Sequence, residues 1–289
     1  MTTVSPGTAH RCQFHLNSYH STVYFTPYLN KFLAEHGVSD DMAVYFAGRA
    51  APLGAVGPGV ITAIFNGFAH GLVAELFPGL WQQVAPSAVL EARLRAVDAT
   101  LRQVLDEREL DSPGMVRAAE LALRAAEACE RADRPLFAAN ADLPVPDEPH
   151  LAFWHATTLL REYRGGGHFS VLSEAGLAGL DGLVSHCASP QGMPREFVMT
   201  KRGWTIDDWQ AAEERLRERG LMDKAGALTP KGLRLREQVE EATDRLDRAP
   251  YARLGERDAS ELTELARGFV ASAAALFPPP LLDTFVEPD

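Results

Sequence analysis

Nine histidines stand in this chain of 289 residues, and histidine is the side chain whose ordinary pKa lies nearest to neutral pH. Three of them occupy positions from which they could meet. His155 lies seven residues before Glu162, so both share one face of a helix. His168 follows three glycines, where we expect a turn that folds it back toward Glu162. If the first helix packs against the helix that contains His155, the side chain of His20 lies in the same group. The pattern predicts one pocket between two halves of the chain.

Two chemistries suit such a group. A metal site would use the imidazoles of His20, His155 and His168 with the carboxylate of Glu162 on zinc or iron, although the HxxxH spacing is absent. A metal-free site would use one of the three histidines as the general acid or base. A metal ion is thus the cofactor to consider, and haem is a weaker alternative because no CxxCH motif is present. The structural alternative is a set of buried histidines bonded to backbone carbonyls.

Further polar side chains are candidates to bind a small-molecule ligand in the same pocket. Arginine binds anionic groups through paired hydrogen bonds, which makes Arg49 and Arg161 the first choices. The predicted ligand-binding set is Tyr24, Arg49, Asn66, His70, Arg161, Glu162 and Arg164. The segment that holds Asn66 and His70 carries no charged residue between Arg49 and Glu75, which predicts a buried helix from about Val60 onward.

The overall charge argues against some partners. Twenty-eight Lys and Arg against 39 Asp and Glu leave a formal charge of −11, whereas proteins held to DNA by its phosphates are normally basic. Prolines and glycines interrupt the uncharged segment 50–74, so no membrane helix is expected. Three cysteines without a CxxC pair predict neither disulfides nor a thiolate zinc site. We therefore expect a cytoplasmic protein.

Helical signals dominate the chain and predict a mainly α fold. Ser39–Asp41, Ser112 and Thr205 with Asp208 are the clearest N-terminal caps. Helices are expected over residues 11–35, 41–49, 87–104, 113–132, 151–163, 205–219 and 230–246. The glycines at 165–167 are expected to end a helix, residues 168–187 to form two short helices, and residues 220–229 to form a β-hairpin.

A proline-rich acidic stretch over residues 140–149 reads as a linker between domains. We expect an N-terminal helical domain over residues 8–142 and a second helical domain over 150–275. Residues 276–289 contain three consecutive prolines directly after Phe277 and are expected to form an extended tail.

The second half resembles the winged helix of MarR-type regulators. The residues that carry this resemblance are Leu216, Arg219–Leu221 and Leu228–Gly232, which flank the expected hairpin. Residues 15–255 as a whole are similar to an actinobacterial family described as helix-turn-helix or winged-helix-like, through segments 19–27, 45–54, 154–168 and 202–204. The chain departs from that family over Asn66–His70. The resemblance implies a fold and no catalytic residue.

The expected DNA-reading helix, residues 205–219, carries three arginines among five acidic residues. This balance favours a winged helix used as a scaffold over one that binds nucleic acid. The leading hypothesis is a small-molecule-binding protein, extended to a histidine-dependent enzyme of specialised metabolism. The alternative is a ligand-responsive, DNA-binding transcriptional regulator, and a third is a structural protein without a ligand.

Overall fold

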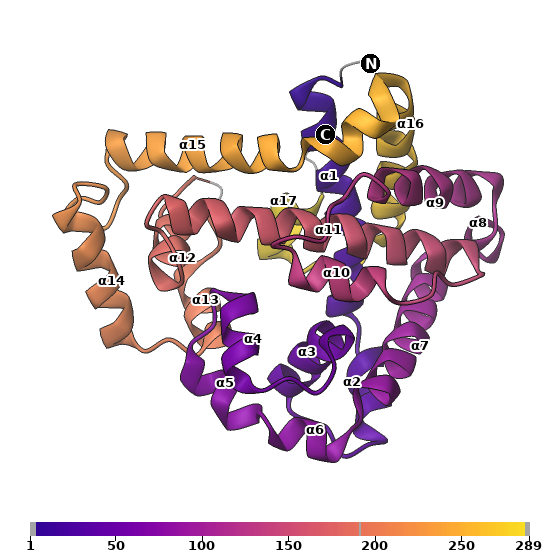
Figure 1. Cartoon of the computed structure of the whole chain (residues 1–289), viewed down its shortest axis with the longest axis horizontal. Helices are drawn as coiled ribbons and strands as arrows, with labels where there is room; N and C mark the ends of the chain where they lie inside the picture. The colour runs from indigo at the N-terminus through magenta and orange to yellow at the C-terminus, as the bar shows by residue number, and fades with distance from the viewer. Residues whose placement is uncertain (1–3, 191, 287–289) are drawn as a thin grey trace. The chain divides into compact units, whose positions relative to one another are not determined.

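A computed structural model describes residues 4–190 and 192–286 of the chain (Figure 1). Its described elements are helices, which confirms the predicted mainly α class. The residues group into two compact units: unit 1 takes segments 1–55, 80–166 and 246–289, and unit 2 takes 56–79 and 167–245. None of the described helices is both long and apolar enough to span a bilayer.

This division differs from the predicted domains 8–142 and 150–275, because the chain leaves unit 1 after residue 55 and returns to it twice. The predicted extended tail over 276–289 is also wrong in its described part. Phe277 and Phe285 stack with ring centroids 5.0 Å apart, and both rings contact Phe25 at 5.2 and 5.4 Å. Aromatic packing thus holds the C-terminal segment in unit 1.

Unit 1 is a bundle in which α1 packs against α16, α16 against α9, and α2 against α7 (Figure 1). In its core the rings of Tyr19, Phe153 and Phe269 lie 4.5–6.1 Å apart. Its elements are α1 (Pro6–Ser21), η1 (Thr22–Phe25), α2 (Tyr28–Ala34), α3 (Asp41–Ala50), η2 (Ala51–Leu53), α6 (Gly79–Gln83), α7 (Pro86–Val104), α8 (Glu107–Leu110), α9 (Pro113–Ala126), α10 (Pro135–Ala141), the first part of α11 (Pro149–Glu174), α16 (Arg248–Ala273), η3 (Ala274–Leu276), η4 (Pro279–Leu281) and α17 (Leu282–Phe285).

Two predicted caps of unit 1 are confirmed. Asp40 accepts a hydrogen bond from the Ala43 amide at 2.8 Å, and Ser112 accepts one from the Met115 amide at 3.1 Å. The single helix predicted over 11–35 is wrong. It divides into α1, η1 and α2. The break before α2 arises because Pro27 has no amide proton and forces Thr26 into extended backbone.

Helix α11 continues through the glycines at 165–167, where the sequence predicted a turn. A Cβ atom on Gly166 would lie 2.7 Å from the Cδ atom of Arg134. The missing side chain therefore lets the segment that carries Arg134 approach the helix closely. This packing outweighs the helix propensity lost at each glycine, about 1 kcal/mol.

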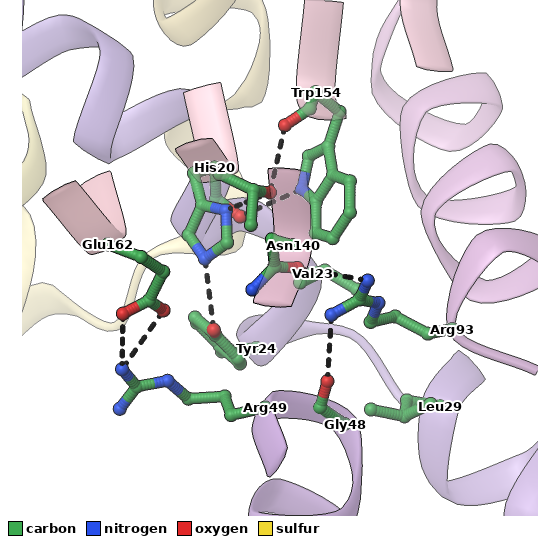
Figure 2. Close-up of a pocket in the computed structure, with 11 residues that line it drawn as sticks. His20, Val23, Tyr24, Leu29, Gly48, Arg49, Arg93, Asn140, Trp154 and Glu162 are labelled. Carbon is green, nitrogen blue, oxygen red and sulfur yellow. Dashed lines mark hydrogen bonds and ion pairs between the residues drawn. The ribbon is translucent and has the colours of Figure 1, made fainter. Parts of the chain in front are cut away.

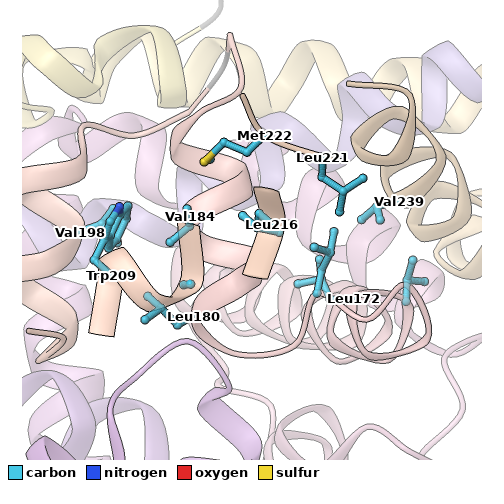
Figure 3. Packing of buried hydrophobic residues seen from close by; sticks show 12 residues of the cluster. Leu172, Leu180, Val184, Val198, Trp209, Leu216, Leu221, Met222 and Val239 are labelled. Atoms are coloured by element: carbon cyan, nitrogen blue, oxygen red, sulfur yellow. The ribbon is translucent and has the colours of Figure 1, made fainter. Parts of the chain in front are cut away.

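Unit 2 is built on one apolar cluster that includes Leu172, Val184, Val198, Trp209 and Leu216 (Figure 3). These side chains come from α11 and from three helices that follow it, so the cluster holds those helices together. The elements of unit 2 are α4 (Pro58–Phe65), α5 (His70–Leu76), the end of α11, α12 (Leu180–Cys187), α13 (Arg195–Arg202), α14 (Ile206–Glu218) and α15 (Pro230–Leu246).

The ends of α14 and α15 form as predicted, whereas the β-hairpin between them does not form as strands. Thr205 and Asp208 make the reciprocal capping box, and Thr229 accepts a hydrogen bond from the Gly232 amide at 3.1 Å. Among the described residues of this turn, only one antiparallel bridge joins Met222 to Leu228. Two backbone hydrogen bonds flank it, from the Asp223 amide to the Ala227 carbonyl and from the Thr229 amide to the Leu221 carbonyl.

The buried helix predicted from Val60 onward is wrong. The segment breaks into α4 and α5 at Asn66, whose φ of +43° ends the first helix. The side chain of Val60 is 47% exposed. The uncharged segment therefore forms two short helices instead of one, and only some of its side chains are buried.

Candidate functional sites

A cluster of polar side chains lies inside unit 1, around a cavity of about 10 Å³ (Figure 2). A cavity of this volume has room for about one water molecule. We call the cluster the polar centre. It contains the cavity-lining residues His20, Tyr24, Arg49, Arg93, Asn140, Trp154, Thr158 and Glu162. All of them belong to unit 1, whereas the sequence predicted a pocket shared by two halves.

His20 is bonded at both ring nitrogens. Its Nδ1 atom lies 2.9 Å from the Thr158 hydroxyl and its Nε2 atom 3.0 Å from the Tyr24 hydroxyl. The ring stacks on Trp154 with centroids 5.1 Å apart. Burial, together with the positive charge of the neighbouring arginines, lowers the pKa of His20 well below its ordinary value. His20 is therefore neutral at pH 7 and a weak base.

Glu162 forms a buried ion pair in the same cluster (Figure 2). Its two carboxylate oxygens each lie 3.0 Å from Nη2 of Arg49, and Oε1 also accepts from Arg161 at 2.6 Å. Burial alone would raise the pKa of Glu162, but the two guanidinium groups outweigh it and hold the pKa below its usual value. The predicted set Arg49, Arg161 and Glu162 is thus brought together, as a salt-bridged group.

Arg93 is the member of the polar centre that the sequence analysis missed. It donates to the Gly48 carbonyl at 3.1 Å and to the Asn140 side-chain oxygen at 3.3 Å, and it lies over the Trp154 ring. It is 8% exposed, and burial lowers its pKa to about 10. A signal was present: Arg93 stands midway between Val89 and Val97, on the apolar face of α7.

The three predicted catalytic histidines are not gathered at this cavity. His155 is buried but does not line it, and burial lowers the pKa of His155 to about 4. His168 belongs to unit 2, where its Nδ1 atom lies 2.9 Å from the Thr243 hydroxyl. Within the described part of the chain, no group of three or more His, Cys, Asp or Glu side chains could hold a metal ion.

The remaining predicted ligand-binding residues also lie elsewhere. Asn66 accepts a hydrogen bond from the Gly179 amide at 2.6 Å within unit 2, and His70 is exposed, with Nδ1 2.8 Å from the Thr62 hydroxyl. Arg164 contacts Asp247 at 3.4 Å in unit 1. Asn66 therefore caps a turn, which explains in structural terms why this chain has asparagine there.

A second candidate site is the helical part of unit 2. Helices α13 and α14 are joined by a turn at Gly203, which has φ +72°, and both pack against α12. The buried face of α14 carries Trp209, Ala212 and Leu216, and its opposite face is exposed. Two helices joined by a short glycine turn, with the second presenting a free face, form a helix-turn-helix.

The sequence pattern of a helix-turn-helix family matches residues 9–278. The chain belongs to this family. The match covers nearly the whole chain, so the family includes residues of unit 1 as well as the helix-turn-helix of unit 2. No curated protein and no solved structure matches the chain.

The arginines on and after α14 are bonded to groups of the protein itself. Arg215 pairs with Asp181 at 2.5 Å, and Arg217 pairs with Glu213 at 2.8 Å. Arg219 donates to the Gly176 carbonyl at 2.5 Å. These contacts occupy the guanidinium groups that would otherwise face a phosphate backbone.

A hollow of about 320 Å³ lies beside α14 and is lined by Asp181, Asp208 and Arg215 among others. Two carboxylates against one guanidinium leave it negative. It is therefore a poor place for a phosphate.

Proposed function

We propose that the protein is a DNA-binding regulator of the helix-turn-helix class, and that α14 enters the major groove. The observation that carries the proposal is the α13–turn–α14 geometry in a chain of this family. In such motifs, residues of the first turns of the second helix contact base edges. Here Asp207 and Gln210 are exposed at those positions.

The chemistry of these two side chains favours particular bases. A glutamine amide pairs with adenine through its N6 and N7 atoms, and an aspartate carboxylate accepts from the N4 amino group of cytosine. Gln210 and Asp207 would supply these two contacts. The binding site would therefore be recognised mainly through bases, with little help from the phosphates.

Salt dependence follows from the same balance. Lys201, Lys224 and Arg234 are exposed cations of unit 2. Each phosphate contact contributes about −0.9 to the slope of log affinity against log salt. Three contacts per chain correspond to a slope of about −3, which is shallow for a DNA-binding protein.

Selection of random duplexes at about 50 mM salt, followed by anisotropy titration of the enriched sequence, tests this function. Gln210→Ala is expected to weaken binding about tenfold and to relax the preference at one adenine. Gln238→Ala, an exposed glutamine on α15, is the matched control and should bind like the wild type. If no duplex is enriched at low salt, the chain does not use this helix-turn-helix on DNA.

Small-molecule binding with acid–base catalysis by His20, His155 and His168 stays a prediction from the sequence. One observation favours its ligand-binding half, namely the excess of buried positive charge in the polar centre. That observation carries a narrower proposal, which is independent of DNA binding.

A further inference from the structure

The polar centre holds more positive than negative charge. The charged groups that act on His20 are the guanidiniums of Arg161, Arg49 and Arg93, and the carboxylate that pairs with two of them is Glu162. Arg93 donates to two neutral oxygens, those of the Gly48 carbonyl and the Asn140 side chain. Arg161 does not line the cavity and its side chain is 22% exposed. The two guanidiniums that line the cavity, Arg49 and Arg93, against the one carboxylate of Glu162 leave an excess of one positive charge.

The neutral polar groups of the cluster do not offset this excess. Burial raises the pKa of the Tyr24 hydroxyl above its ordinary value, so Tyr24 keeps its proton at neutral pH. His20 is neutral and adds no charge of either sign. A buried cation without an opposite charge loses hydration that its contacts only partly replace. An anion beside Arg93 would supply the missing charge.

The cavity sets the size of that anion. Its volume of about 10 Å³ admits one particle of water size, and Arg49, Arg93 and Tyr24 all line it. We propose that the polar centre binds one halide-sized monovalent anion, with chloride as the natural occupant. The N–H groups of the Arg93 guanidinium are the hydrogen-bond donors to such an ion. The Tyr24 hydroxyl is not a donor to it: Thr158 donates to the Trp154 carbonyl, so His20 Nδ1 donates to Thr158 and Nε2 accepts the Tyr24 proton. Phosphate and organic carboxylates are several atoms larger than this space.

Sodium bromide and sodium chloride are the probes. A crystal grown with bromide should show an anomalous peak in the cavity beside the Arg93 guanidinium. In solution, the thermal midpoint should rise saturably with chloride when sodium gluconate keeps the ionic strength constant, because a ligand of the folded state alone stabilises it.

Variants test the assignment to this cluster. Arg93→Gln removes a charged donor, and loss of a charge-assisted hydrogen bond corresponds to about 10-fold to 100-fold weaker halide binding. Arg93→Lys is a milder variant that keeps the charge with fewer donors, and it should weaken binding by about tenfold or less. Arg95→Gln on the same helix is the control, since that side chain is 54% exposed and should leave chloride stabilisation unchanged.

The outcomes separate the alternatives. A bromide peak in the cavity with chloride stabilisation reduced in Arg93→Gln or Arg93→Lys supports the site. Equal midpoints in chloride and gluconate, with only water in the cavity, overturn it. So does chloride stabilisation that persists unchanged in both variants, because the ion would then bind elsewhere.

Discussion

Replacing Glu162 by glutamine is the sharpest test of how unit 1 is stabilised. The variant keeps the size of the side chain and removes the charge that faces Arg49 at 3.0 Å and Arg161 at 2.6 Å. The side chain is only 6% exposed, so water screens the pair weakly. Breaking a buried ion pair by neutralising one partner costs about 3–5 kcal/mol. For a domain of about 150–250 residues this lowers the thermal midpoint by roughly 6–20 °C.

Urea unfolding at pH 7, followed by tryptophan fluorescence, measures this loss directly. Glu264→Gln is the control, because Glu264 pairs with Arg267 at 2.7 Å while 65% exposed. Exposed pairs contribute about 0–1 kcal/mol. A loss at Glu162 no larger than the loss at Glu264 would refute the reasoning that the buried charge matters.

The same pair has a pH dependence of known sign. The pKa of Glu162 is lowered in the folded state. Its stabilisation is therefore present above the ordinary glutamate pKa of about 4.3 and is lost as the pH falls through the lower folded value. The difference between the wild type and Glu162→Gln should shrink over that acidic range.

Three further predictions concern single residues. The folded pKa of His155, about 4, lies below its ordinary 6.5, so the unfolded chain binds the extra proton and stability falls as the pH drops from 6.5 to 4. His155→Gln should flatten this slope by up to about 1.4 kcal/mol per pH unit in urea titrations at several pH values, and an unchanged slope would contradict it. Asp40→Ala removes the cap of α3 and should cost about 1 kcal/mol by the same unfolding assay. Gly203→Ala should destabilise unit 2 by about 1–3 kcal/mol, because φ is +72° and the new Cβ would lie 2.7 Å from Leu72 Cβ. A urea midpoint equal to that of the wild type would count against this.

Local signals predicted the helix starts well. Asp40, Ser112 and Thr205 each carry a side-chain oxygen next to a run of helical residues, and each accepts the expected amide hydrogen bond. Such caps depend on atoms within three residues of one another, so the sequence alone contains the whole interaction.

Features that depend on distant residues were missed. From the sequence alone Gly166 predicts a turn. Only the structure shows that the close approach of Arg134 requires a residue without a side chain at this position. From the sequence alone Arg93 is expected to be a solvent-exposed charge. The structure shows that it is buried and donates to the Gly48 carbonyl and the Asn140 side chain. The histidine cluster failed for the same reason, since spacing along a helix does not reveal which other helix lies against it.

The three-segment construction of unit 1 has a consequence for the order in which it folds. The amide of Ser5 and the hydroxyl of Thr8 both donate to Glu256, about 250 positions later in the chain. At ribosomal rates of about 5–20 residues per second, roughly 12–50 s separate the synthesis of these groups. During that interval the side of α1 that packs on α16 has no partner, so its apolar residues stay uncovered until α16 itself has been synthesised.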